Sequence, residues 1–364
     1  MNSYSSLIIG IGLLFLNGSS NTEGFDIQFS NTIFKEKTFL RKVDSLASER
    51  IVFYNCENLF HPSNDSTTND EDFTPGGYYH WTYKRYYNKI NKIGKLIIAI
   101  GEGRFPAIVG LCEVENRRVL QDLIQKSILS RSNYKIIHKD SPDARGIDVA
   151  LIYDKESFLP VKYTYVPVNA RGMEDLRTRE ILYVNGYLMD SIIIHIFVNH
   201  WPSRRGGKLA SDEKRKHVAG ILRELVDSCY LHDPEANILI MGDFNDEPLD
   251  NSLYEVLGAK EPDNYSGYPY LLNLMINSLK SGDGTHYRKN NFYEASVLDQ
   301  FIVSNSLYQG FNRLKINTEN GFIYKKDFLL DEKNGRPLRT YQGLKYLGGF
   351  SDHLPIYTDI QIVN

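Results

Sequence analysis

Residues 237–246 are Asn-Ile-Leu-Ile-Met-Gly-Asp-Phe-Asn-Asp, an apolar run that ends on acidic and amide side chains. A short apolar run of this kind predicts a buried strand. Asp243 and Asn245 then lie at the end of that strand. Because residues i and i+2 of a strand point the same way, we expect both side chains to lie on one face at the edge of a sheet.

The same pattern recurs along the chain. Residues 51–54 are an apolar run that leads to Asn55 and Glu57, and residues 107–112 end on Glu113. Isoleucines at helical spacing in residues 86–100 predict an amphipathic helix between them. A second helix is expected after Asn116, and a third is expected to open at Ser211, a good N-cap residue.

Most of residues 134–199 show a different sequence pattern, which predicts strands separated by turn residues. The expected strands are residues 134–137, 147–153, 161–166, 181–188 and 192–199. Mixed strands with a few interspersed helices imply two sheets packed face to face with helices outside. Functional residues would then gather along one rim of the sandwich.

Length and composition fit one large globular domain. The chain has 364 residues, 42% of them hydrophobic and 24% charged, with no short internal repeat. Its formal charge of -3 argues against a surface that is basic throughout, so a phosphate site must be local. The three cysteines show no Cys-x-x-Cys spacing, which disfavours a metal cluster or a dithiol redox site and favours small buried side chains.

The N-terminus carries a segment that resembles a targeting signal. Residues 7–16 are apolar but too few to span a bilayer, and small polar residues follow them, although no Lys or Arg precedes them. We expect residues 1–22 to be a signal peptide, residues 23–49 a leader segment and residues 50–364 the catalytic domain. The mature chain would then have no membrane span and would be exported to the periplasm or the exterior. The alternative is a cytoplasmic protein whose first apolar run is buried in the fold.

Oxygen-bearing side chains collect at the ends of the apolar segments. Such a set suits a hard divalent cation such as Mg²⁺, Mn²⁺ or Ca²⁺, whereas the thiolate and multiple imidazole ligands typical of zinc are missing. The set consists of Asn55, Glu57, Glu113, Asp243, Asn245, Asp299 and Asp352, together with His200 and His353.

Seven ordered motifs resemble those of the endonuclease/exonuclease/phosphatase superfamily, over nearly all of residues 50–360. They are Tyr-Asn-Cys-Glu-Asn-Leu at 54–59, Gly-Leu-Cys-Glu-Val-Glu-Asn at 110–116, Arg-Gly-Ile-Asp-Val-Ala-Leu at 145–151, Asn-His-Trp-Pro-Ser-Arg at 199–204, Gly-Asp-Phe-Asn-Asp at 242–246, Leu-Asp-Gln-Phe at 298–301 and Gly-Phe-Ser-Asp-His-Leu-Pro at 349–355. The fourth motif particularly resembles predicted exported bacterial nucleases. The resemblance implies the DNase I-like fold, a four-layer α/β sandwich of two packed mixed β-sheets flanked by helices.

The resemblance also implies a division of roles on the metal side. Glu113 resembles the principal metal ligand, helped by Asn55 or Glu57 directly or through water, and Asp352 is expected to be a further metal-side carboxylate. A hard cation against a non-bridging phosphate oxygen offsets negative charge and orients the phosphate for in-line attack. Mg²⁺ is the expected cofactor, with Mn²⁺ or Ca²⁺ as alternatives.

The remaining members of the set are expected to do the proton and phosphate chemistry. Asp243 is the candidate base for the attacking water, and Asn245 is expected to hold the phosphate or the nucleophile through its amide. His353 resembles the histidine that contacts the scissile phosphate, with Asp299 fixing its tautomer and favouring imidazolium. His200 resembles a second histidine that serves as general acid for the leaving oxygen.

Substrate contacts are expected close to His200. Arg204 and Arg205 begin the densest basic stretch, which continues through Lys208, Lys214, Arg215 and Lys216 and is either a local phosphate-backbone contact or a solvated loop and helix start. Arg179 and Asp148 match family positions near the phosphate, with a structural role equally open. Some of the 25 tyrosines could stack on bases or sugars near the rim.

Three functions remain open from the sequence. The first is an exported, monomeric, metal-dependent nuclease or phosphodiesterase that cleaves nucleic acid. The second is a phosphomonoesterase or lipid phosphodiesterase, which would cleave an inositol phosphate, sphingomyelin or another small phosphoester on the same fold, because a fold does not fix its substrate. The third is a non-catalytic scaffold, against which the intact acids and both histidines argue.

Overall fold

The computed structural model describes residues 48–168, 176–189, 192–204, 206–262, 270–289, 293–317 and 320–363. The expected signal peptide and all but the last two residues of the expected leader lie outside the described residues, as does Arg205. In the described part of the chain, no helix is long and apolar enough to cross a membrane. Cys56, Cys112 and Cys229 are buried and unpaired, as expected.

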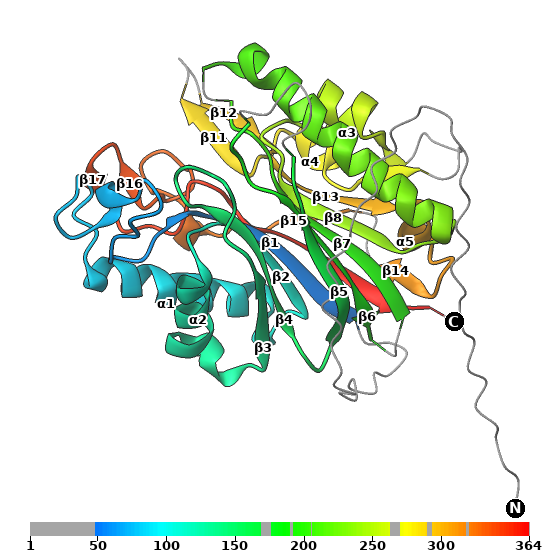
Figure 1. Cartoon of the computed structure of the whole chain (residues 1–364), viewed down its shortest axis with the longest axis horizontal. Coiled ribbons are helices and arrows are strands. Elements are labelled where there is room, and N and C mark those ends of the chain that lie inside the picture. Colours follow the sequence, from blue (N-terminus) through cyan, green and yellow to red (C-terminus); the bar gives the residue numbers. More distant parts are fainter. Residues whose placement is uncertain are drawn as a thin grey trace, which may run out of the picture. The chain divides into compact units, whose positions relative to one another are not determined.

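Two mixed sheets form the centre of the domain (Figure 1). The first has the order β14 (Leu314–Ile316), β18 (Ile356–Ile362), β1 (Ser48–Leu59), β2 (Ile108–Val114), β4 (Asp148–Asp154) and β3 (Tyr134–His138), with β15 (Phe322–Ile323) also on β18. The second has the order β5 (Phe158–Val166), β6 (Ile181–Leu188), β7 (Ile192–His200), β8 (Ile238–Asp243), β13 (Asp299–Ser304), β10 (Leu271–Asn273) and β9 (Ala259–Lys260). Parallel pairs β1–β2 and β7–β8 stand among antiparallel neighbours.

Strand β1 shows how the layers pack. Ile51 and Phe53 face the core between the two sheets, whereas Val52 and Tyr54 belong to the core on the other side of the sheet. All four side chains are buried, because successive residues of a strand point to opposite faces and both faces of this sheet are covered.

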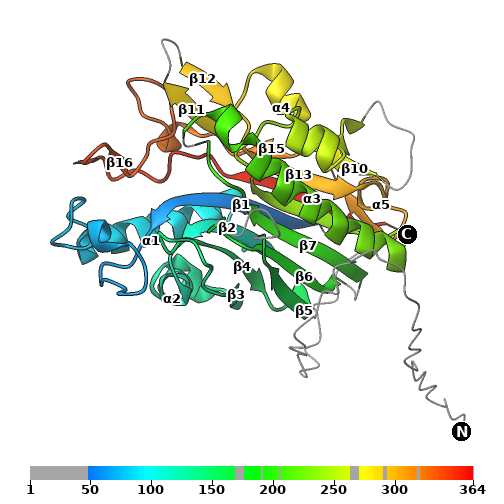
Figure 2. The same cartoon turned by 45° about the horizontal axis from the view of Figure 1, so that its top comes forward.

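Helices cover the outer faces and complete the four layers (Figure 2). They are α1 (Tyr83–Ile100) and α2 (Arg117–Lys126) on the first sheet, and α3 (Lys208–His232), α4 (Ile276–Ser281) and α5 (Asn305–Gln309) on the side of the second. Helix α3 contacts β7 where the Cys229 thiol lies 3.5 Å from Nδ1 of His195. The expected α/β sandwich is therefore confirmed.

The expected strands and the first two helices are present, but the predicted start of the third helix at Ser211 is wrong. Helix α3 begins at Lys208 with Gly207 as its N-cap, so Ser211 lies inside the first turns. The Ser211 hydroxyl donates to the Gly207 carbonyl and accepts from Arg215, which explains why a good capping residue stands within the helix.

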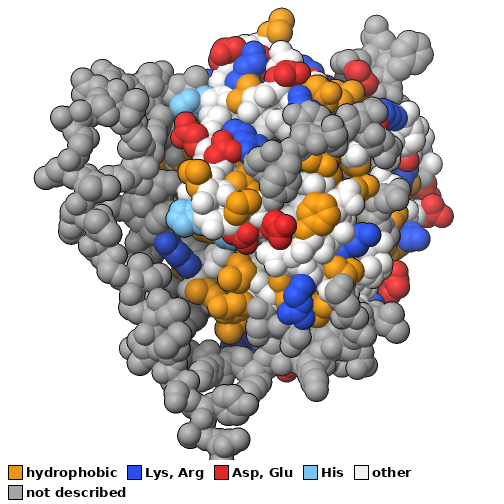
Figure 3. Space-filling model, turned by 90° about the vertical axis from the view of Figure 1, so that its right-hand side faces the viewer, with side chains coloured by type: hydrophobic (Ala, Val, Ile, Leu, Met, Phe, Trp, Pro, Cys, Tyr) orange, Lys and Arg blue, Asp and Glu red, His pale blue; other side chains and the backbone are white. Residues whose placement is uncertain are grey.

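Two small hairpins extend from the sandwich. They are β11 (His286–Lys289) with β12 (Tyr293–Ser296), and β16 (Tyr341–Gln342) with β17 (Lys345–Tyr346). The β16–β17 hairpin lies near the start of α1 in both cartoon views. On the molecular face in Figure 3, described acidic, basic and hydrophobic side chains are intermixed without a dominant basic patch.

Candidate active site

The site forms where β7 and β8 end and β13 begins, with β1 of the first sheet beside them. Asp243, the last residue of β8, pairs in register with His200 on β7 and with Asp299 on β13. The first sheet contributes Asn55, whose side-chain amide donates to Oδ2 of Asp243 at 3.0 Å. Asn55 and Asp243 are 188 positions apart in the sequence, so distant segments of the chain meet around one carboxylate.

The backbone turns sharply at the residues that enter this site. Glu57, Glu113 and Asn245 all have left-handed φ angles, of 48°, 57° and 51°. The register of β1 and β2 slips between Asn55 and Leu59, and that of β2 and β4 slips at Glu113. Bulges of this kind re-aim side chains at the rim of a sheet, and a non-glycine residue in this region costs free energy that the surrounding structure must offset.

Asp243 is held on both of its oxygens. Oδ1 accepts from the Asn245 backbone N–H at 2.9 Å, and Oδ2 accepts from Asn55. Burial raises the pKa of Asp243 to about 7, with the neighbouring Asp299 carboxylate adding to the rise and His353 opposing it. A carboxylate with a pKa near neutrality can take a proton from water at physiological pH.

His353 and Asp299 form the expected pair. Nδ1 of His353 donates to Oδ2 of Asp299 at 2.7 Å, and Nε2 lies 3.8 Å from Oδ2 of Asp243. Burial alone would lower the pKa of His353, but Asp299 and Asp243 raise it well above its usual value. The ring is therefore an imidazolium between two carboxylates.

His200 lies against the same carboxylate. Its Nε2 is 3.7 Å from Oδ2 of Asp243 and 3.9 Å from Oε1 of Glu113, while its buried Nδ1 has no hydrogen-bond partner among the described residues. Burial, reinforced by the positive charges of Arg179 and Arg145, lowers the pKa of His200 well below its usual value. The lowered pKa favours the neutral ring, and the role of His200 as general acid stays a prediction.

The expected metal-side residues occupy the neighbouring part of the rim. Oε2 of Glu113 accepts from the Asn58 backbone N–H at 2.8 Å. Glu57 and Asp352 share one cation, because Arg339 lies 3.3 Å from Oε1 of Glu57 and 2.6 Å from Oδ2 of Asp352. Burial and the charge of Asp352 raise the pKa of Glu57 to about 7.

This donor set fits a divalent cation. Its carboxylates are crowded, and the buried Oδ1 of Asp299 has no hydrogen-bond partner among the described residues, which is the situation that a bound cation relieves. Asp243, Asp299 and His353 have ligand atoms that all lie within 4.8 Å of one another, but the protonated His353 has no lone pair for a metal, so the carboxylates are the donors. Glu113, Glu57 and Asp352 add the carboxylate oxygens that Mg²⁺ prefers.

The expected substrate-binding residues are engaged by protein groups. Guanidinium nitrogens of Arg179 donate to Asp143 at 2.9 Å and to the Trp201 carbonyl at 2.8 Å. Asp148 accepts from the Ser141 N–H at 2.8 Å, and its other oxygen lies 2.9 Å from Nε2 of His138. The structure thus gives Arg179 and Asp148 supporting contacts, and their contact with substrate stays a prediction.

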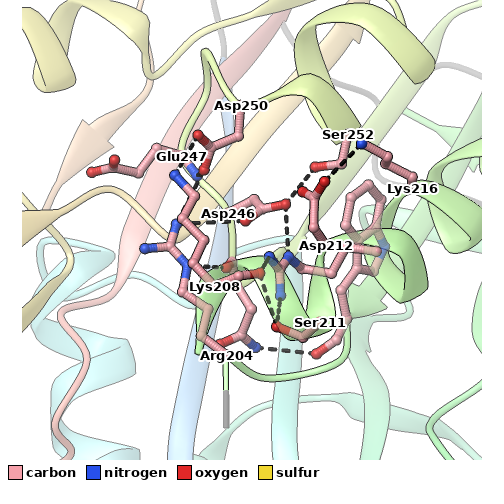
Figure 4. Close-up of polar contacts among 12 residues, drawn as sticks. Arg204, Lys208, Ser211, Asp212, Lys216, Asp246, Glu247, Asp250 and Ser252 are labelled. Carbon is pink, nitrogen blue, oxygen red and sulfur yellow. Dashed lines mark hydrogen bonds and ion pairs between the residues drawn. The ribbon is translucent and has the colours of Figure 1, made fainter. Parts of the chain in front are cut away.

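The basic stretch after His200 is largely neutralised by acids. Arg204 donates to the Asn245 carbonyl at 2.6 Å and pairs with Asp250 at 3.1 Å, and Lys208 also pairs with Asp250 (Figure 4). Arg215 is fully buried against Asp246, with Nε 2.7 Å from Oδ2. The interpretation that Arg215 contacts a phosphate is therefore wrong. These pairs instead fix the loop that carries Asn245.

Three residues of the site were missed from the sequence. Arg339 bridges two carboxylates, and Lys89 is buried with its ammonium bonded to the Glu57 carbonyl and, at 2.6 Å, to the Thr340 hydroxyl. The His286 ring lies 4.8 Å from that of His353, and burial lowers the pKa of His286 to about 4. The helical spacing does indicate that Lys89 is buried, since it lies on an otherwise apolar face of α1.

Comparisons with known proteins identify the family of the chain. A family model described as Endonuclease/Exonuclease/phosphatase family matches residues 50–362. A search of curated proteins found no match.

Solved structures share the fold at low sequence identity. TDP2 from D. rerio, complexed with a single-strand DNA product, is 12% identical, with a TM-score of 0.53 over 86% of this chain and 99% of that one. The human Nocturnin catalytic domain with a bound sulfate anion is 16% identical, with a TM-score of 0.53 over 87% and 94%. An endonuclease/exonuclease/phosphatase family protein from Bacteroides thetaiotaomicron is 16% identical, with a TM-score of 0.53 over 87% and 98%.

Proposed function

Because the chain belongs to the endonuclease/exonuclease/phosphatase family and is a metal-dependent phosphoester hydrolase, we propose that it is an exported nuclease that cleaves nucleic acid by in-line attack of water. The observation that carries this proposal is the arrangement around Asp243, with Asn55, His200, Asp299 and His353 within reach of one buried carboxylate. The similarity of fold to a TDP2 structure that holds a single-strand DNA product supports the choice of nucleic acid.

Each residue has a defined part in the proposed reaction. Asp243, oriented by the Asn55 amide and the Asn245 N–H, takes the proton of the attacking water. His353, held as imidazolium by Asp299, stabilises charge that develops on the phosphate oxygens. A bound divalent metal, for which we propose Mg²⁺ at Glu113 with Asn55, Glu57 and Asp352, would offset charge on a non-bridging phosphate oxygen.

A substrate panel in Mg²⁺ tests the proposal. We expect turnover of single-stranded or plasmid DNA or of RNA to exceed that of inositol phosphates, sphingomyelin and a simple phosphomonoester. Turnover of a small phosphoester with no cleavage of any nucleic acid would overturn the nuclease and support the second function. The panel is informative because the mixed surface charge of the chain does not by itself demand a polyanion.

Asp243→Asn supplies the inactive reference for this panel. We expect a loss of 10²-fold or more in kcat, on the order expected for removal of a general base, with the unfolding temperature preserved. Exhaustive chelation should abolish activity of the unaltered enzyme, and Mg²⁺ should restore it. Near-normal turnover in either experiment contradicts the assigned chemistry.

Export and assembly state are part of the proposal. The apolar run at residues 7–16 supports secretion of a chain cleaved near residue 22, which then acts as a monomer. N-terminal sequencing of the protein recovered from periplasm or medium, with light scattering of the same sample, tests both points. An intact N-terminus and a cytoplasmic location would contradict export.

A further inference from the structure

A cavity of about 160 Å³ opens beside the metal-side carboxylates. Glu57 and Arg339 line one part of it, and Phe73, Tyr79 and Tyr341 line another. An engineered protein cavity of about 150 Å³ is known to accept benzene, so this one has room for a single planar ring system rather than for a large ligand.

The aromatic walls are held in place before any ligand arrives. Phe73 is stacked on Phe60 at 4.4 Å and on Tyr79 at 4.5 Å between ring centroids, and Tyr341 meets Tyr79 edge-on at 4.8 Å. The Tyr341 hydroxyl donates to the Tyr79 carbonyl at 2.8 Å, which ties the β16–β17 hairpin to the loop before α1. Side chains that are already ordered lose little conformational entropy when a ring binds against them.

The polar part of the cavity connects directly to the catalytic rim. Asn58 lines the cavity, and its backbone N–H donates to Glu113 at 2.8 Å. Arg339 uses Nε for Glu57 and one terminal nitrogen for Asp352, while its side chain stays 43% exposed. A guanidinium has five N–H donors, so Arg339 retains donors for a phosphate of the bound chain.

We propose that this cavity, lined by Asn58, Phe73, Tyr79, Arg339 and Tyr341, binds the base of a nucleotide next to the scissile phosphate. This inference rests on the proposed nuclease function and makes it more specific. An uncharged planar base stacks on aromatic side chains whatever its identity, while the phosphate beside it meets Arg339 and the metal-side carboxylates. Because bases in a duplex are stacked inside the helix, the site selects single-stranded or unpaired nucleic acid.

Binding of short fluorescent oligonucleotides tests the proposal. The Asp243→Asn protein in Mg²⁺ prevents cleavage, and fluorescence anisotropy gives Kd for a single strand, for the same strand with all bases removed, and for a blunt duplex. We expect the single strand to bind at least about tenfold more tightly than the base-free strand, as stacking of one base implies. Equal Kd values for these two strands would overturn the proposal.

Variants of the cavity locate the effect. Tyr79→Leu, and separately Phe73→Leu, should weaken binding of the normal strand by about tenfold and leave the base-free strand unchanged. Tyr78→Leu is the matched control, because Tyr78 is 71% exposed and does not line the cavity. Equal weakening of both strands by Tyr79→Leu and Phe73→Leu would show a general loss of structure and overturn the base contact.

The inference and the proposed function fail in different ways. If the enzyme cleaves nucleic acid but Tyr79→Leu and Phe73→Leu bind the normal strand as tightly as Tyr78→Leu, only the base site is wrong. If the enzyme neither binds nor cleaves any oligonucleotide while it hydrolyses a small phosphoester, both are wrong. Unfolding temperatures of the three variants, measured alongside, exclude misfolding as the cause of weaker binding.

Discussion

Asp299 shows how one buried carboxylate can set the charge of a catalytic ring. It bonds Nδ1 of His353 at 2.7 Å, and the N–H of its own backbone donates to the Thr285 hydroxyl at 3.1 Å. Its charge is one of the causes that raise the pKa of His353 against the opposing effect of burial. Asp299 therefore keeps His353 protonated at pH values where a free histidine would be neutral.

This dependence predicts the pH profile of activity. If Asp243 acts as base and His353 as cation, kcat/KM rises as Asp243 loses its proton, with a pKa of about 7, and falls at higher pH as His353 loses its own. Asp299→Asn removes a charge that raises the pKa of His353, so the alkaline limb should move to lower pH by about 1–3 pH units. The profile of kcat/KM from pH 5 to 10 measures this, as macroscopic values of a coupled site.

A matched surface variant separates the two roles that Asp299 can have. Asp227→Asn removes a carboxylate whose side chain is 52% exposed, on α3, and should leave both limbs in place. If Asp299→Asn lowers kcat/KM equally at every pH without moving the alkaline limb, Asp299 is structural and does not tune His353.

Among the elements, α2 has a well-defined start. The Asn116 side chain accepts from the backbone N–H groups of Arg118 at 2.9 Å and of Val119 at 3.1 Å. Asn116→Ala should therefore lower the free energy of unfolding by about 1 kcal/mol, measured by urea denaturation. Thr82, the N-cap of α1, makes one longer contact of 3.4 Å, so Thr82→Ala should cost less. An equal or larger effect at Thr82 would contradict this ranking.

The connection between α3 and the end of β8 depends on a buried ion pair. Arg215 and Asp246 are both fully buried, and the Ser252 hydroxyl also donates to Asp246 at 2.6 Å. Arg215→Met removes the nearer of the two arginines beside Asp246, since Arg204 lies at 3.6 Å, and should lower the free energy of unfolding by about 3–5 kcal/mol. Because Asp246 follows Asn245 directly, we also expect a loss of kcat from displacement of that loop.

A double variant distinguishes pairing from packing in this connection. Arg215→Met combined with Asp246→Leu removes both charges, and we expect it to recover much of the stability that Arg215→Met loses. Thermal and urea unfolding of both single variants and the double variant provide the full cycle. A double variant as unstable as the sum of the single ones would show that the two residues do not interact energetically.

The elements were predictable where periodicity decides them. Residues 181–188 have the bounds of β6 as expected, and the isoleucines at helical spacing in residues 86–100 are buried in α1. The start of the third helix was predicted wrongly from Ser211, because capping preference is a local property. The start of α3 depends instead on Gly207, whose φ of 112° only glycine adopts easily. Arg215, in the same helix, looked like a surface cation because its partner Asp246 is 31 residues away in the sequence.

For the whole molecule, the strand-end acids were predictable but their cationic partners were not. Asp243 and His353 follow apolar runs in recognisable motifs, and the structure brings them within 3.8 Å of each other. Arg339 lies 282 residues from Glu57, in a segment without helical or strand periodicity, so only the assembled fold shows that it bridges two carboxylates. Lys89 lies at helical spacing from Tyr86, so its burial could be expected, whereas its contact with the Glu57 carbonyl depends on the tertiary structure.

The distribution of charge over the molecule predicts a weak dependence of nucleic acid cleavage on salt. The chain has a formal charge of -3, and Arg204, Lys208 and Arg215 are paired with acids beside the site. Since each phosphate of a single strand that a protein cation neutralises contributes about 0.7 to the slope of log affinity against log salt, we expect a slope of roughly -1 to -2 for a single-stranded substrate. Measurements of log(kcat/KM) from 50 to 300 mM KCl at constant Mg²⁺ give this slope, and Lys214→Gln, at the surface of α3, serves as a comparison.

A slope steeper than about -4 would contradict the prediction, because it would show that several basic residues bind the phosphate backbone. A shallow slope would place recognition in local contacts at the rim, where Arg339 pairs with Glu57 and Asp352.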